Sequence, residues 1–80
     1  MTGLSEVREA RWRALAAAGY AASQGDRALR PLWVWTIQGL RAEGCPIATI
    51  AAGAGITRGA VWQSIRAART VTTEGVAAHV

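Results

Sequence analysis

The chain has 80 residues, which is enough for one small domain with a modest hydrophobic core. Nine basic residues, all of them arginine, against five acidic ones give a net charge of +4 and a pI near 11.1. This balance favours nucleic acid or an anionic membrane surface as a partner, although a basic soluble protein without such a partner has the same composition. A single cysteine, Cys45, and a single histidine, His79, exclude an internal disulfide and the zinc motifs built from several such residues.

The sequence also lacks the signatures of secretion, membrane insertion and catalysis. It has neither the basic start and apolar run of a signal peptide nor an apolar run of membrane-spanning length, so we expect a cytoplasmic protein. Paired carboxylates, a phosphate-binding glycine loop and a Ser/His/Asp set are all missing, and Cys45 has no histidine or acid at a spacing that would activate it. We therefore expect no enzyme, metal site, cofactor or small-molecule ligand.

The first predicted helix runs from Ser5 to Ala22. Ser5 is suited to cap it, Glu6 lies in the first turn, and alanine has the highest helix propensity. Its expected inner face consists of Val7, Ala14, Leu15 and Ala18. Trp12 falls outside that face, either packing against a neighbouring helix or contacting a partner. The arginines at positions 8, 11 and 13 are expected on a solvated face, with a phosphate backbone as the alternative.

Polar residues from Ser23 to Arg30 predict a loop, and a second helix from Pro31 to Glu43 follows because proline favours the first helical turn. One apolar stripe follows helical spacing and comprises Leu29 or Leu32, Trp33, Ile37 and Leu40. Trp33 is expected in the core, whereas Trp35 fits a core position and a dimer surface equally well. Gly44 is expected to end this helix, with Cys45 in the capping position of the next.

The stretch 46–69 reads as two short helices joined by a tight turn. Apolar stripes on its two segments comprise Ile50, Ala51 and Ala54, then Val61 and Ile65. Between them, Gly55 can adopt the positive φ that ends a helix, Ile56 is an apolar anchor, and the Thr57 hydroxyl can cap the next helix. Ala51 lies one turn before Gly55, where only a small side chain lets two helices cross closely.

This pattern resembles the helix-turn-helix of bacterial and phage DNA-binding regulators, and the matching residues are Ile50, Ala51, Gly55, Ile56, Val61 and Ile65. The segment 57–69 is also similar to the second helix of sigma-factor region-four domains. We therefore expect an all-α bundle of about four helices with the helix-turn-helix at 46–69, a domain at 1–69 and a C-terminal tail at 70–80. The tail is left open as a short strand, a small helix or a disordered segment.

If Val61 and Ile65 face inward, the helical periodicity turns a polar face of the second helix outward. The candidate DNA-binding residues on that face and its flanks are Thr57, Arg58, Gly59, Trp62, Gln63, Arg66 and Arg69. The expected function is a sequence-specific transcriptional regulator, such as a small phage or mobile-element repressor, that inserts helix 57–69 into the major groove of double-stranded DNA as a homodimer.

Two other functions remain open. One is a protein-interaction module of the same shape that binds its partner through Trp33, Trp35 or Trp62. The other is a membrane-surface helix over residues 8–20, which ranks last because that segment lacks a large continuous apolar face. Trp62 itself is expected at the DNA-facing edge, with packing against Trp33 or Trp35 as the alternative.

Overall fold

The computed structural model contains four α-helices and one short 3-10 turn, so the all-α class expected from the sequence is confirmed. The helices are α1 (Leu4–Gly25), α2 (Arg30–Ala42), α3 (Ile47–Ala54) and α4 (Arg58–Ala78), and the 3-10 turn η1 (Arg27–Leu29) lies between α1 and α2. The structure describes the backbone of residues 3–78 and the side chains of residues 3–68.

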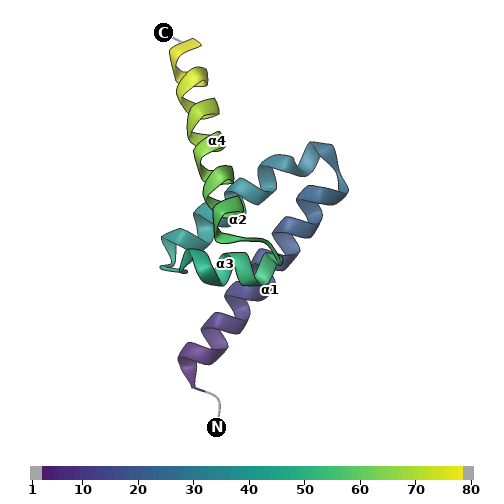
Figure 1. The fold of residues 1–80 in the computed structure, drawn as a ribbon, viewed down its shortest axis with the longest axis vertical. Coiled ribbons are helices and arrows are strands. Elements are labelled where there is room, and N and C mark those ends of the chain that lie inside the picture. Colours follow the sequence, from purple (N-terminus) through teal and green to yellow (C-terminus); the bar gives the residue numbers. More distant parts are fainter. Residues whose placement is uncertain (1–2, 79–80) are drawn as a thin grey trace.

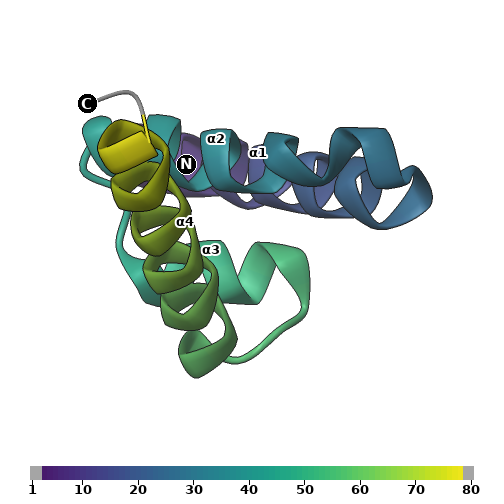
Figure 2. The same ribbon diagram turned by 90° about the horizontal axis from the view of Figure 1, so that it is seen from above.

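The helices form a hairpin with two further helices on one side of it. α1 and α2 run antiparallel and side by side, and α3 crosses α1 (Figures 1 and 2). α4 packs on α3 and α2 through its first turns, and its far end rises away from the other helices (Figure 1). The molecule is consequently long, measuring 54 × 25 × 19 Å.

The core lies where α1, α2, α3 and the start of α4 meet. Its buried apolar residues are Trp12, Ala16, Trp33, Ile37, Leu40, Cys45, Ile47, Ile50, Ala51 and Val61. In a chain without phenylalanine, two tryptophans supply the aromatic volume, as expected for Trp33. The ring of Tyr20 meets that of Trp33 edge to face, with centroids 5.0 Å apart and an interplanar angle of 71°.

Two helix-interior glycines allow the helices of the hairpin and α3 to approach closely. A Cβ added to Gly19 of α1 would lie 2.7 Å from Cγ2 of Thr36 on α2. A Cβ added to Gly53 of α3 would lie 2.5 Å from the backbone oxygen of Arg13 on α1. Both distances are shorter than van der Waals contact. α1 can therefore approach α2 and α3 this closely only because a glycine lies at each contact, Gly19 on α1 itself and Gly53 on α3.

The inner face expected for the first helix is wrong. Val7, Ala14, Leu15 and Ala18 are exposed, and the buried positions of α1 are Trp12, Ala16, Gly19 and Ser23. Because α2 and α3 both pack closely on α1, the residues of α1 at the points of closest approach are small ones rather than aliphatic ones. Ser23 is accommodated because its hydroxyl donates to the backbone oxygen of Tyr20 at 2.7 Å.

The helix ends also differ from the expected ones. Gly3, not Ser5, precedes α1, and the expected loop 23–30 is largely helical, since α1 continues to Gly25 and η1 follows. The Asp26 carboxylate accepts a hydrogen bond from the Ala28 amide at 2.9 Å, which caps η1. The proline of α2 lies in its first turn, as expected.

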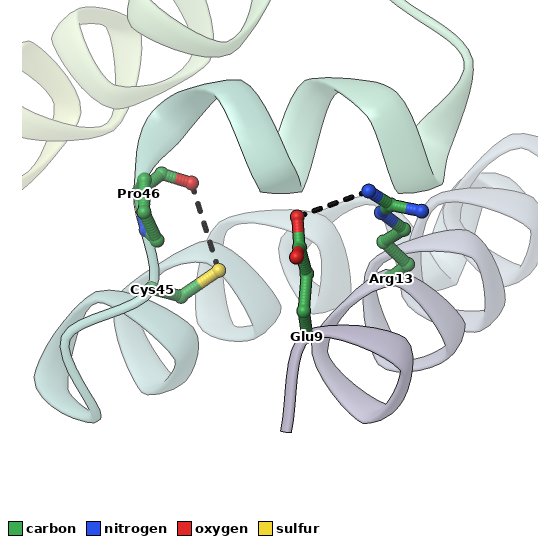
Figure 3. Close-up of polar contacts among 4 residues, drawn as sticks. All are labelled: Glu9, Arg13, Cys45 and Pro46. Carbon is green, nitrogen blue, oxygen red and sulfur yellow. Dashed lines mark hydrogen bonds and ion pairs between the residues drawn. The ribbon is translucent and has the colours of Figure 1, made fainter. Parts of the chain in front are cut away.

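Cys45 is not a helix cap. Pro46 precedes α3, and the Cys45 side chain is fully buried in the core, where its thiol donates to the backbone oxygen of Pro46 at 3.6 Å (Figure 3). Burial raises the pKa of the Cys45 thiol. The side chain therefore behaves as a small apolar group in this position.

α4 is longer than the expected helix 57–69. It continues without a break to Ala78 and passes residue 69, where the sequence suggested the border between a domain and a tail. Of the three alternatives for that tail, the helix agrees with the structure, because the backbone is helical through Ala78. His79 lies outside the described residues.

Candidate nucleic-acid interface

The connection between α3 and α4 begins with a glycine in the left-handed region. Gly55 has φ +73°, as the sequence predicted. The Gly55 amide donates to the Ala52 oxygen at 3.3 Å and the Ile56 amide donates to the Ala51 oxygen at 3.0 Å. These two bonds form a Schellman motif, which satisfies carbonyls at the end of α3 and turns the chain sharply toward α4.

Thr57 caps the start of α4. Its hydroxyl oxygen accepts a hydrogen bond from the Ala60 amide at 3.1 Å, and its carbonyl accepts from the Val61 amide at 3.3 Å. The cap leaves the amides of Arg58 and Gly59 as donors that α4 itself does not use. An exposed helix start of this kind carries partial positive charge and suits an anionic group.

Over its described side chains, residues 58–68, α4 is anchored through one side. Val61 is fully buried, and Ile65 packs partly buried against the same core, as the spacing predicted. Ile56 of the connection also packs against this core. Burying one Val side chain contributes roughly 1.5–3 kcal/mol, so these contacts fix the rotation of α4 about its axis.

The opposite side of α4 is exposed and carries most of the candidate residues. Thr57, Arg58, Gly59, Trp62, Gln63 and Arg66 are all solvent-exposed. The rotation set by Val61 brings Gly59, Gln63 and Arg66 to one outer face, with Arg58 and Trp62 on its edge. The side chain of Arg69 lies outside the described residues, although its backbone belongs to α4.

Gly59 has no packing role among the described residues. An added Cβ would meet only the Thr57 hydroxyl, at 3.8 Å, which is ordinary contact. The glycine therefore leaves the backbone of the first turn bare toward solvent, where an outside molecule can approach it closely.

Charge is distributed unevenly along the chain. Between Glu43 and Glu74 the sequence contains no acidic residue, and its basic residues there are Arg58, Arg66 and Arg69. Two ion pairs lie on the hairpin: Arg13 pairs with Glu9 within α1 at 3.0 Å (Figure 3), and Arg11 pairs with Glu43. The sequence between positions 44 and 73 therefore carries basic residues and no acidic ones.

The four tryptophans divide between core and surface. Trp12 and Trp33 are buried, which resolves Trp12 in favour of packing, whereas Trp35 is 65% exposed and Trp62 is 44% exposed. Trp62 does not pack as core against Trp33 or Trp35. An exposed indole beside arginines can stack on a base or lie along a sugar.

Gly53 does not belong to the turn that Gly55 forms. Gly53 lies inside α3 and faces the backbone of Arg13. It therefore positions α3, and through the turn also α4, on the α1–α2 hairpin. A glycine within an otherwise strong helix-forming run was the available signal.

Within residues 3–78, no helix is long and apolar enough to cross a membrane. Among the described side chains, residues 3–68, no three His, Cys, Asp or Glu residues lie together in a way that would hold a metal ion. Searches of protein families, curated proteins and solved structures find no match to the chain.

Proposed function

We propose that the protein is a sequence-specific DNA-binding regulator that places the outer face of α4 in the major groove. The observation that carries the proposal is the division of one helix into two sides. Val61 is fully buried, while Gly59, Gln63 and Arg66 are exposed on the other side of α4. Together with the resemblance of residues 46–69 to helix-turn-helix regulators, this favours a small repressor of the phage or mobile-element kind.

The chemistry of the outer face suits base edges. Gln63 offers a donor and an acceptor together, which matches adenine in the major groove. Arg66 and Arg58 carry planar guanidinium groups that match guanine in a two-point contact. The bare backbone at Gly59 permits close approach, and Trp62 at the edge suits a thymine methyl group or a sugar.

The start of α4 suits the phosphate backbone. The capping hydroxyl of Thr57 and the unused amides after it are donors for a phosphate oxygen. Arg69, one helix turn or so beyond Arg66, is proposed as a further phosphate contact. An α-helix with its side chains is about 10–12 Å across, close to the width of the major groove, so α4 fits as a reading element.

A reader of this size needs a second copy to reach high affinity. One small module buries little surface on DNA, whereas a two-fold dimer reads two half-sites about one helical turn apart. We therefore propose a homodimer on a site with two related halves.

The test begins with selection of bound double-stranded oligonucleotides from a random pool. An enriched motif with two related halves is the expected result. Arg66→Ala should then weaken binding and relax base preference at one position of each half, whereas Arg8→Ala, which removes the same charge far away on α1, should leave the preference unchanged. Binding that is independent of sequence in the wild-type protein, or equal preference in wild type and Arg66→Ala, would contradict the proposal.

A second candidate function is a protein-interaction module, favoured by the exposure of Trp35 and Trp62. The salt dependence of binding distinguishes the two candidate functions. DNA binding through several arginines should weaken steeply as salt rises, whereas binding through indole rings should change little. Trp62→Ala with intact DNA selectivity but lost capture of a protein partner would favour the second candidate.

A further inference from the structure

A glycine in the last turn of α2 has no packing partner among the described residues. Gly19 and Gly53 are interior helix glycines that face another helix at less than van der Waals distance, but an added Cβ on Gly39 meets nothing within 4 Å. Gly39 is exposed and does not have a positive φ. An alanine here would favour the helix and fit the available space, so the missing side chain indicates an approach from outside the chain.

A large exposed side chain lies one helical turn before this gap. Trp35 precedes Gly39 by four residues on α2, which places both on the same face. Its indole is 65% exposed, the most exposed of the tryptophans. Both residues line a shallow groove of about 370 Å³ between α1 and α2, whose other walls include Leu15, Ala18 and Leu32. A protrusion and a gap therefore lie next to each other on one surface.

We propose that this groove is the surface through which two copies of the chain associate, with their α2 helices antiparallel. A two-fold axis that crosses α2 midway between positions 35 and 39 brings residue 35 of each copy opposite residue 39 of the other. The indole of Trp35 then fills the gap above Gly39 of the second copy, and the symmetry makes the same contact twice. A second copy fits because the surface is complementary to itself.

The charges around the groove agree with this pairing. Its charged lining residue is Glu43, which is already paired with Arg11, so association leaves no lone charge in the centre.

The size of the surface sets the expected affinity. A standard stable interface uses about 20–30 residues on each side. The groove and its rim provide fewer, so we expect reversible association at micromolar concentrations rather than an obligate dimer. This inference does not require DNA, and it goes beyond the proposed function by naming the surface and its pairing.

The experiment measures molar mass by sedimentation velocity, without DNA, from about 1 to 500 μM, a range that brackets micromolar association. The wild-type mass should rise from 8.4 kDa toward twice that value. Trp35→Ala removes the protrusion and Gly39→Leu fills the gap, and each should weaken association about thirtyfold, as expected for a central hot spot. Trp62→Ala, which removes an exposed indole elsewhere, serves as the control and should associate like wild type.

Mixing the two variants provides the decisive arm. Trp35→Ala retains the gap and Gly39→Leu retains the protrusion, so an equimolar mixture should form mixed dimers with one Trp35–Gly39 contact and one small–large contact. Circular dichroism of each variant checks that the helices are intact. A wild type that stays at 8.4 kDa, association that survives both substitutions, or folded variants that fail to form mixed dimers would each overturn the inference. These outcomes test the α2 surface alone, whereas sequence preference on DNA and its loss in Arg66→Ala are measured separately, so a failure of this inference and a failure of the proposed DNA binding are distinguishable.

Discussion

The packing of α3 on α1 can be tested at Gly53, which holds the α3–α4 unit against the hairpin. In Gly53→Ala, the new Cβ would lie 2.5 Å from the backbone oxygen of Arg13 and 2.7 Å from its Cα. Backbone atoms of a helix cannot rotate away as a flexible side chain does. The two helices must therefore separate, which loosens the contacts around Ile50 and Ala51 in the core.

The magnitude follows from two opposing terms. Replacing a helix-interior glycine with alanine favours folding by about 0.5–1 kcal/mol. Overpacking costs about 1–3 kcal/mol, and the upper end applies because both short contacts are to backbone atoms. The net expectation is a loss of about 2 kcal/mol, which for a domain of this size corresponds to a melting temperature lowered by roughly 8–16 °C.

Gly39→Ala is the matched control, because the same substitution in the last turn of α2 meets nothing within 4 Å. It should raise the melting temperature by roughly 2–8 °C, because alanine favours the helix over glycine and no steric cost opposes it. Both variants are followed by circular dichroism at low micromolar concentration, where self-association contributes least. If Gly53→Ala melts at or above the wild-type temperature, the close approach of α3 and α1 does not require a glycine at position 53.

Two further predictions concern the turn and the Arg11–Glu43 pair. Gly55→Val places a β-branched residue at φ +73° and should cost about 1–2 kcal/mol; an unchanged thermal midpoint would mean that the left-handed turn is unnecessary. The Arg11 guanidinium, hydrogen-bonded to Glu43, lowers the pKa of that carboxyl from 4.5. Its stabilisation is therefore complete above about pH 4.5 and is lost as the pH falls through the lower folded-state value. Glu43→Gln should accordingly lose less stability than wild type between pH 7 and pH 3, and melting curves with the same pH dependence in both proteins would contradict this role.

Local signals in the sequence predicted the α3–α4 turn well. Gly55 with positive φ, the Thr57 cap and the burial of Val61 and Ile65 each depend on residues within one or two helical turns of each other. The exposure of Gln63 and Arg66 then follows from the same periodicity, since one buried stripe fixes the rotation of the whole helix. Interactions of this range are encoded in spacing, so the sequence alone predicts them.

The face that α1 buries could not be predicted in this way. Its exposed face carries Leu15 and Val7, while its buried face carries, besides Trp12, the small residues Ala16 and Gly19. Small residues are thus buried where the usual ranking by hydrophobicity favours aliphatic ones. This burial of small residues arises because the distance between helices is set by partners distant in sequence, Thr36 on α2 and the backbone contact with Gly53 on α3. Once small residues are committed to close packing, larger apolar side chains such as Leu15 are displaced to the rim of the groove. Because small residues take the close contacts of α1, its hydrophobic pattern does not predict its buried face. For the same reason an apolar surface remains between α1 and α2, and Trp35 and Gly39 lie on this surface.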